Sequence, residues 1–223
     1  MQEIPEILLD VNRLLGGSGI DWAVCGGFAL DLFLGRGTRA HGDLDLSAAE
    51  AHRGRIQRWM LERGWQVWEF RGQGMMRPLN ADTPSEPGRN LMCVREGCEL
   101  VTFWPCDVPG MALHEWHSKG IRTLNYMEFL FRGQPEGEAF FSRSPDRAIL
   151  RRGGIPFLAP EVVLLYKASQ PERPVNQGDH AAAFPMMDGE QKAWFLTALE
   201  TRYPEGHPWL EGGDDHAGAV GRL

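Results

Sequence analysis

The sequence predicts an α+β fold, in which a small mixed sheet flanked by helices is followed by a mainly helical C-terminal half. Three observations predict it. An apolar segment, a glycine pair and a helical segment follow one another within residues 22–34. Short apolar stretches with strand character recur between residues 43 and 104, and helical periodicity dominates after Pro160. The 223 residues suffice for one large domain, or for two small ones that share an interface.

The first three elements are short and clearly separated. Apolar residues at helical spacing predict an amphipathic helix over residues 4–15. The apolar run of residues 22–25 has strand character and is followed by a glycine pair. A helix over residues 28–34 comes next and ends at Gly35, which gives the order strand, glycine turn, helix.

The following residues predict a strand, a helix and a second strand. Asp and Leu alternate over residues 43–46, so both carboxylates lie on one face of a strand. Ser47 and Glu50 match a capping box, which predicts a helix that ends at Gly64. Residues 65–70 then return as a strand.

The middle of the chain is rich in turn signals. Residues 71–90 contain repeated Gly and Pro, which predicts a long surface loop of the kind that often forms a lid. Residues 90–94 and 98–104 flank a short connection with a glycine, which predicts a hairpin. Residues 105–145 supply aromatic core material, but their periodicity is weak.

The C-terminal half has helical signals. Pro160 suits the first turn of a helix, and a further helix is expected over residues 179–187. Asp188 and Gln191 form a second capping box, which predicts a helix that ends near Arg202.

The charge balance limits the partners of the chain. It has 23 Lys and Arg residues against 30 Asp and Glu residues, a net charge of −7. An acidic chain repels a phosphate backbone, so a cationic small molecule is a better expected partner than nucleic acid. The sequence has no apolar run of membrane-spanning or secretory type, and its four cysteines lack zinc-site spacing. We therefore expect a cytoplasmic protein with reduced thiols and no membrane partner.

Two aspartates predict a metal site on the strand at residues 43–46. Alternate residues of a strand project the same way, about 6.6 Å apart along the chain. Asp43 and Asp45 can therefore share a divalent metal ion. Carboxylate oxygens are hard ligands that suit Mg²⁺.

An anion site is predicted beside this metal site. Gly26 and Gly27 lack side chains, so backbone N–H groups at the start of the next helix can approach a polyphosphate. Arg39, together with Arg36, lies on the loop between the two sites and can neutralise further phosphate charge. Phosphoryl transfer depends on such positioning and electrostatics, so it is the predicted reaction class. A glycine pair or an Asp-x-Asp strand alone is usually structural, whereas their ordered combination is specific.

This segment resembles the DNA polymerase beta-type nucleotidyltransferases, and within them the aminoglycoside-2''-adenylyltransferase-like family. The resemblance rests on a Gly-Gly-x-Ala opening at Gly26, a Gly-Arg-x-Thr-Arg loop at Gly35 and a His-x-Asp-x-Asp strand at His41. In the C-terminal half it covers residues 158–167, Asp179 and residues 206–210.

The resemblance implies roles for further residues. It places a third carboxylate, as general base or metal ligand, at Glu99, where relatives more often have Asp. It gives Lys167 a phosphate contact. His41 can bind phosphate or orient Asp43, or it can pack beside the strand.

The implied activity is Mg²⁺-dependent transfer of NMP, with AMP from ATP preferred over other NTPs, to a hydroxyl acceptor, with two Mg²⁺ ions. We expect a nucleotidyltransferase core over residues 1–105, a region over residues 106–210 that completes the cleft, and a disordered tail over residues 211–223. The negative charge favours a polycationic acceptor such as an aminoglycoside.

Two alternatives stay open. Toxin-like relatives modify tRNA or protein hydroxyls, although a tRNA reader needs a basic stripe. A non-catalytic nucleotide-binding protein is conceivable because Val175 and Asn176 replace the charged residues of the family's Arg-x-Lys-Asp segment, and because Glu99 stands in place of Asp.

Overall fold

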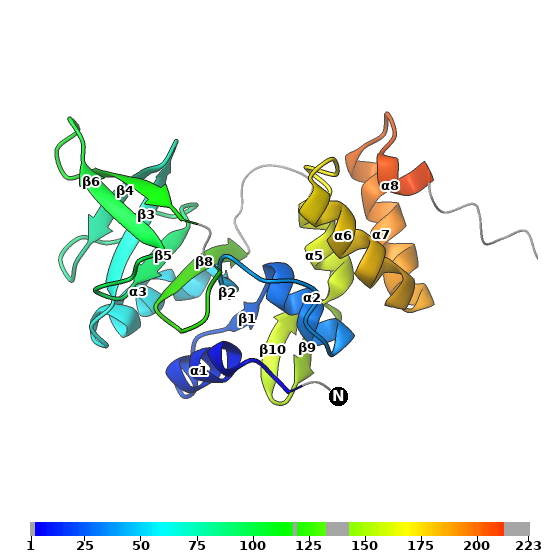
Figure 1. Cartoon of the computed structure of the whole chain (residues 1–223), viewed down its shortest axis with the longest axis horizontal. Helices are drawn as coiled ribbons and strands as arrows, with labels where there is room; N and C mark the ends of the chain where they lie inside the picture. Colours follow the sequence, from blue (N-terminus) through cyan, green and yellow to red (C-terminus); the bar gives the residue numbers. More distant parts are fainter. Residues whose placement is uncertain (1–2, 118–119, 133–142, 212–223) are drawn as a thin grey trace, which may run out of the picture.

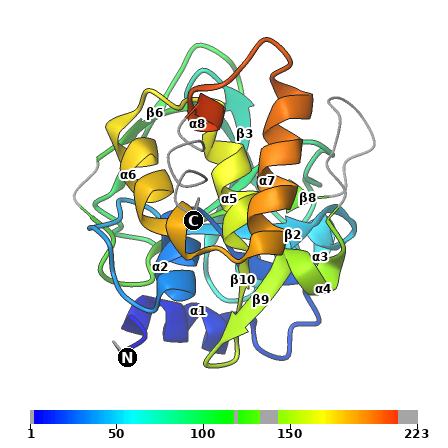
Figure 2. The same cartoon turned by 90° about the vertical axis from the view of Figure 1, so that its right-hand side faces the viewer.

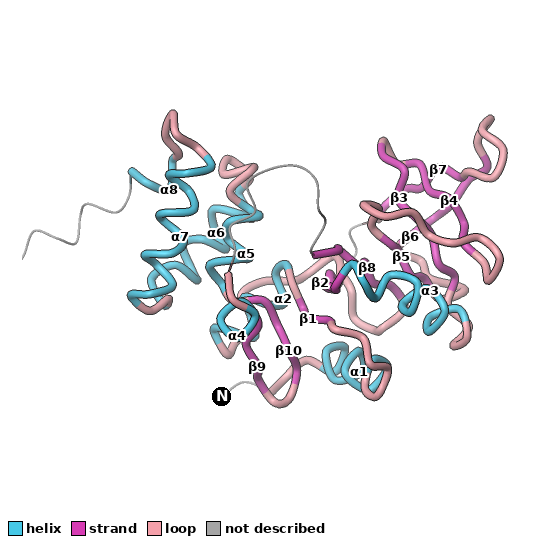
Figure 3. The backbone as a smooth tube through the Cα atoms, turned by 180° about the vertical axis from the view of Figure 1, so that it is seen from behind, coloured by secondary structure: helices cyan, strands magenta, loops and turns pink. Residues whose placement is uncertain are grey.

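The computed structural model describes residues 3–117, 120–132 and 143–211. Within these residues, ten strands form one mixed sheet in the order β6-β7-β4-β3-β5-β8-β2-β1-β10-β9 (Figure 3). The strands are β1 (Trp22–Val24), β2 (Asp45–Ala49), β3 (Gln66–Gly72), β4 (Met75–Leu79), β5 (Leu91–Val94), β6 (Val101–Pro105), β7 (Ala112–Trp116), β8 (Tyr126–Arg132), β9 (Ile149–Arg152) and β10 (Ile155–Leu158). The helices are α1 (Glu6–Leu15), α2 (Gly26–Leu34), α3 (Arg53–Leu61), α4 (Pro145–Ala148), α5 (Pro160–Lys167), α6 (Pro174–Ala183), α7 (Gly189–Arg202) and α8 (Pro208–Glu211). This organisation confirms the expected α+β fold class.

Strand β8 joins two parts of the sheet that come earlier in the chain. It pairs antiparallel with β5 on one side and parallel with β2 on the other. β2 pairs in turn with β1, and β1 pairs in parallel with β10. The strands of residues 22–49 and of residues 66–94 therefore become one sheet only through β8, so the sheet continues beyond residue 105.

The molecule has a strand-rich end and a helical end, with β1, β2 and β8 between them (Figure 1). β3, β4 and β6 lie at the strand-rich end, where α3 contacts β3. At the helical end α5 contacts both α6 and α7, and the three helices are seen together in Figure 2. Helix α2 contacts α5, α6 and β10, so it connects the helical end to the sheet.

Alternation along the central strands separates the core from the candidate site. Leu44 and Leu46 are fully buried, as are Met127 and Phe129 on β8. Burying a side chain of this size stabilises the fold by about 1.5–3 kcal/mol. Because successive side chains of a strand point to opposite faces, the polar residues between these apolar ones lie on the other face of the sheet.

Several predicted elements are confirmed. The amphipathic first helix is α1, and the order strand, glycine turn, helix is that of β1 and α2. At the start of α7, the Asp188 side chain accepts a hydrogen bond from the Gln191 backbone N–H (2.8 Å), and the Gln191 side chain accepts one from the Asp188 N–H (3.1 Å). The second capping box is therefore formed as predicted.

Other predicted elements are wrong because distant strands compete for the same edges. The hairpin of residues 90–94 with residues 98–104 does not form: β5 pairs with β3 and β8, and β6 pairs with β7. Ser47 is not a helix cap, because β2 continues through Ala49 and α3 starts after a short 3₁₀ turn. The loop expected over residues 71–90 contains strand β4, which pairs with β3.

The described chain ends at Glu211, so residues 212–223 of the expected tail lie outside the described residues. Across the part of the chain that the structure describes, no helix is both long and apolar enough to cross a membrane.

A histidine lies inside the aromatic packing of the helical end. The His180 ring is stacked on Trp209 with a centroid distance of 4.4 Å and on Phe184 at 5.0 Å. Burial and the nearby charge of His207 lower the pKa of His180 from 6.5 to about 4. Its Nε2 atom is buried without a hydrogen-bond partner. The folded state therefore favours the neutral ring.

We expect His180→Phe to flatten the acid side of the stability profile. The folded pKa of His180 lies below its unfolded value, so its contribution is fully present above pH 6.5 and is lost as the pH falls toward 4. Phenylalanine keeps the stack but cannot bind a proton. Thermal unfolding followed by circular dichroism should give similar melting temperatures for the variant and the wild type at pH 7.5, and a higher one for the variant at pH 4.5. Parallel pH profiles of the two proteins would contradict the assignment.

Candidate active site

Two acidic residues lie opposite each other on the two parallel strands at the centre of the sheet. Asp45 on β2 is in register with Glu128 on β8. The backbone N–H of Glu128 donates to the carbonyl of Leu44 (3.0 Å), which fixes this register. Asp43 comes two residues earlier and is exposed. The fold therefore brings Asp45 and Glu128 together from positions 83 residues apart in the sequence.

The electrostatics of this carboxylate group favour a bound cation. Burial raises the pKa of Asp45 to about 8, with further contributions from the negative charges of Asp43 and Glu128. The positive charge of Lys167 opposes this rise. Burial also raises the pKa of Glu128, and the charge of Asp43 adds to the effect. Both carboxylates are thus short of positive charge, which a divalent metal ion would supply.

Both glycines of the Gly-Gly pair are required by close contacts at the start of α2. Gly26 has a left-handed backbone with φ of 64°, and a Cβ there would lie 2.8 Å from the Asp45 carboxylate. A Cβ on Gly27 would lie 2.5 Å from the His41 ring and 2.7 Å from the Arg39 guanidinium. Only glycine lets the carboxylate, the arginine and the helix start come this close.

A buried contact between a histidine and an aspartate supports the loop before β2. His41 Nε2 lies 2.6 Å from the Asp31 carboxylate, and the Thr38 hydroxyl and backbone N–H donate to the other oxygen of Asp31 (2.7 and 2.9 Å). The ring of His41 also packs on Phe28 at a centroid distance of 4.2 Å. The structure therefore places His41 as a support of the loop that carries Asp43.

Two cations are held at the junction of the sheet and the helices by one buried carboxylate. Asp179 on α6 lies 3.2 Å from Arg39 Nε and 2.9 Å from Lys167 Nζ, and its side chain is only 2% exposed. The Asn176 side chain accepts a weaker hydrogen bond from Lys167 Nζ (3.4 Å). Arg39 and Lys167 are thus fixed beside the start of α2, where anions are favoured.

A cavity of about 460 Å³ opens next to these groups. Its wall includes Gly26 and Asp45 together with three cationic side chains, Arg132, Lys167 and Arg173. Apolar side chains complete the lining: Leu130, Phe131, Leu158, Val163 and Tyr166. The cavity therefore combines an apolar wall with cationic groups, which suits an organic anion.

The structure gathers most of the predicted site residues, with one replacement. Gly26, Gly27, Arg39, Asp43, Asp45 and Lys167 all lie around the carboxylate group or its cavity. Glu99 lies in an exposed turn between β5 and β6 and is not brought to this place. The carboxylate that the structure places beside Asp45 is instead Glu128. The sequence indicates this position only through Met127-Glu128-Phe129, in which an acidic residue lies between two apolar residues, as in a strand with one apolar and one polar face.

In the described residues, no three His, Cys, Asp or Glu side chains form a complete metal site. Magnesium in phosphoryl-transfer sites is commonly held by one or two carboxylates together with phosphate oxygens of the substrate. Asp43 and Asp45 supply such hard oxygen ligands, and burial together with the charges of Asp43 and Glu128 raises the pKa of Asp45. These residues therefore fit Mg²⁺ held jointly with a nucleotide.

One family model matches the N-terminal third of the chain. Residues 7–72 match the profile of the aminoglycoside-2''-adenylyltransferase family. The matched stretch contains the glycine pair, Arg39, Asp43 and Asp45, so the family resemblance is confirmed there. It also bears out the prediction of an enzyme of the nucleotidyltransferase type. A comparison with curated proteins finds no significant match.

Solved structures with a similar fold include antibiotic adenylyltransferases. The lincomycin-bound lincosamide antibiotic adenylyltransferase LnuA is 12% identical, with a TM-score of 0.52 over 82% of this chain and 97% of that chain. The antibiotic-resistance factor ANT(2'')-Ia in solution is 14% identical, with a TM-score of 0.49 over 90% and 92% of the two chains. Its crystal structure with adenylyl-2''-tobramycin is 15% identical, with a TM-score of 0.46 over 89% and 95%. The match to LnuA shows a shared fold.

In the presence of a chelator, we expect Asp45→Asn to become more stabilising as the pH rises. The folded pKa of Asp45, about 8, exceeds its unfolded value of 3.8. Its protonated form therefore contributes stability that is fully present below the unfolded pKa and is lost as the pH rises through 8. The melting-temperature advantage of the variant should grow by ~3 °C or more between pH 5 and pH 9. For the exposed Asp107→Asn the difference from wild type should stay constant, and equal behaviour of the two variants would contradict the prediction.

Proposed function

We propose that this protein transfers a nucleoside monophosphate, AMP from ATP above other NTPs, to a hydroxyl group of a small antibiotic-like acceptor in a Mg²⁺-dependent reaction. One observation carries the proposal: Asp45 and Glu128 lie in register, with the charge of Asp43 acting on both, beside the helix start at Gly26. A cation site and an anion site are thus adjacent, as a metal-bound nucleotide requires.

The nucleotide is proposed to occupy the cavity between the sheet and α5. Lys167 and Arg39 face the start of α2, where the triphosphate would gain from both the cations and the backbone N–H groups. Arg173 adds a further positive charge to the cavity wall. The apolar side of the cavity, with Phe131 and Tyr166, would take the nucleobase.

Asp43 and Asp45 would hold Mg²⁺, which when bound neutralises phosphate charge and orients the α-phosphate. Glu128 accepts the proton of the acceptor hydroxyl while the hydroxyl oxygen forms a bond to the α-phosphorus. The bond from the α-phosphorus to the bridging oxygen breaks, and pyrophosphate leaves with that electron pair. The raised pKa of Glu128 makes its carboxylate a stronger base for this step.

The acceptor is proposed from the family match and the charge of the chain. The matched family is named for aminoglycoside adenylylation, and the structural neighbour LnuA is bound to lincomycin. A net charge of −7 favours the approach of a polycation over that of a nucleic acid. Aminoglycosides are therefore the first acceptors to test, and lincosamides the second.

The test is incubation of the protein with Mg²⁺, each NTP in turn and a panel of aminoglycosides and lincosamides. We expect pyrophosphate release and a mass gain of one NMP on an acceptor, both abolished by chelator. If pyrophosphate is released and the NMP is found on tRNA or on a protein, the acceptor belongs to that class and not to the small antibiotics. If none of the NTPs raises the melting temperature in the presence of Mg²⁺, the proposal as a whole is contradicted.

Paired substitutions distinguish Glu128 from Glu99. Glu128→Gln should lower the rate by about 10²- to 10⁴-fold, the usual effect of removing a positioned general base. Glu99→Gln is the matched control and should keep the rate within about twofold, because Glu99 is exposed in the turn between β5 and β6. The reverse result would restore Glu99 as the third carboxylate.

Asp179→Asn tests whether fixing the two cations matters for nucleotide binding. Without the buried charge, Arg39 and Lys167 lose their common partner, and we expect the KM for Mg·NTP to rise by about tenfold, equivalent to about 1.4 kcal/mol. Glu190→Gln removes a carboxylate that pairs with Arg143 and Arg147 away from the cavity, and it should leave KM unchanged. Equal effects of both variants would refute a specific role for Asp179.

A further inference from the structure

Each oxygen of the Glu128 carboxylate has its own hydrogen-bond donor. The Asn90 side-chain amide donates to Oε1 (3.2 Å), and the Tyr126 hydroxyl donates to Oε2 (3.4 Å). Tyr126 lies two residues away on β8 and is buried, so its position is set by the sheet. Asn90 precedes β5 and ends the connection from β4, so its position depends on that connection.

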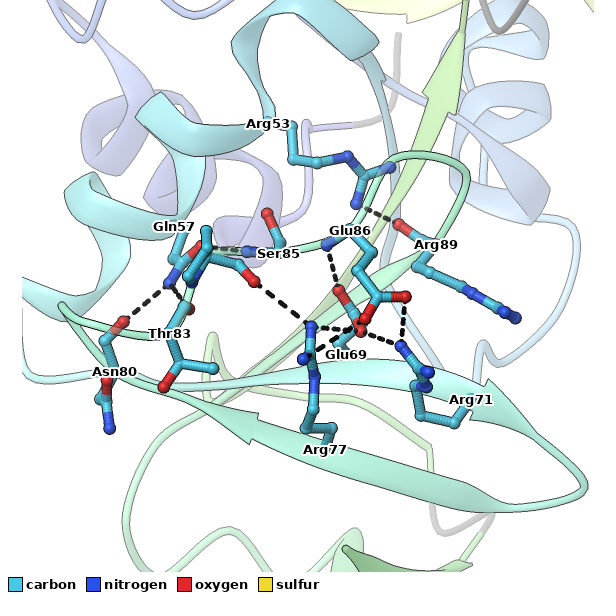
Figure 4. Close-up of polar contacts among 11 residues, drawn as sticks. Arg53, Gln57, Glu69, Arg71, Arg77, Asn80, Thr83, Ser85, Glu86 and Arg89 are labelled. Carbon is cyan, nitrogen blue, oxygen red and sulfur yellow. Dashed lines mark hydrogen bonds and ion pairs between the residues drawn. The ribbon is translucent and has the colours of Figure 1, made fainter. Parts of the chain in front are cut away.

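The connection of residues 80–90 is held at its first half by one side chain of α3. The Gln57 amide nitrogen donates to the carbonyls of Asn80 (2.8 Å) and Thr83 (2.7 Å), and its oxygen accepts from the backbone N–H of Ser85 (3.0 Å) (Figure 4). Gln57 is only 5% exposed. One buried amide thus satisfies three backbone groups that no strand or helix would satisfy.

The second half of the connection is held by a buried carboxylate on β3. Glu69 is fully buried and accepts from the backbone N–H of Glu86 (2.5 Å), while Arg71 and Arg77 lie 2.9 Å from its carboxylate (Figure 4). The same two arginines pair with the side chain of Glu86. A buried charge network adds little net stability compared with apolar packing, so fixing a geometry is the use that best explains it.

The last residues of the connection are tied to the wall of the cavity. Arg53 on α3 donates to the carbonyl of Arg89 and pairs with Glu50. Its guanidinium also lies over the ring of Phe131, 3.8 Å from the ring centroid, and Phe131 lines the cavity. The chain is therefore fixed directly before Asn90.

We infer that Asn90 is a positioning residue for Glu128, and that residues 80–90 serve as a fixed strap that holds it there. The sequence predicts a loop of the lid type in this region, whereas the contacts of Gln57, Glu69 and Arg53 anchor it along its length. A carboxylate held by two donors keeps one orientation toward the attacking hydroxyl, which lowers the cost of reaching the transition state. This inference rests on the proposed function of Glu128.

The test compares Asn90→Ala with Gln57→Ala, which loosens the strap without touching Glu128. We expect Asn90→Ala to lower kcat by about 10- to 100-fold, and Gln57→Ala by about 3- to 10-fold, with the KM for Mg·NTP within about threefold of wild type in both. Gln191→Ala is the matched control: this buried amide binds Glu161 and is not among the residues that line the cavity, so its loss should reduce the melting temperature but leave kcat within about twofold.

Two outcomes would overturn the inference. If Asn90→Ala raises KM and leaves kcat unchanged, Asn90 binds nucleotide directly. If Gln57→Ala lowers kcat no more than Gln191→Ala does, the strap does not act on Glu128. Crystal structures of the wild type and of Asn90→Ala give a readout that does not need turnover: the Glu128 carboxylate should leave its place in the variant. An inactive wild type would refute the proposed function, whereas an unmoved Glu128 would refute the positioning role.

Discussion

The burial of two carboxylates side by side at the centre of the sheet is the constraint around which this protein is organised. Asp45 and Glu128 are placed side by side by the register of β2 and β8, and Asp43 adds a third charge. A fold that gathers such groups loses stability when they ionise, as the raised pKa of Asp45 shows. Natural proteins keep such an arrangement where a ligand relieves it.

The elements around the carboxylates are arranged to tolerate this charge. The glycine at position 26 lets the start of α2 approach Asp45, and Lys167 lies close enough to lower its pKa. Asp179 then holds Lys167 and Arg39 together across the junction of the sheet and the helices. Charged residues from the N-terminal and C-terminal halves of the chain therefore interact around the Asp45 carboxylate.

Much of this arrangement was accessible from local sequence patterns. The glycine pair and the capping box at Asp188 each depend on residues within a few positions of one another, so the sequence predicts them correctly. The alternation from Asp43 to Leu46 also predicts a strand, which in the structure begins at Asp45 and continues to Ala49. Pairing between distant strands was not accessible in this way. The apolar run at β5 looks the same whether its neighbour is β6 or β8. The weak periodicity around β8 gives no local sign that Glu128 lies opposite Asp45.

The position of β8 also has a consequence for how the chain acquires its structure during synthesis. Strands β1 and β2 and strands β3 to β5 leave the ribosome before β8 does, and until residue 132 emerges β2 and β5 each have an unpaired edge. Unpaired strand edges invite association with other chains. Completion of the sheet also needs contacts between residues far apart in the sequence, which slows folding. The nascent chain therefore passes through a stage in which two edges of its future central strands are open to association with other chains.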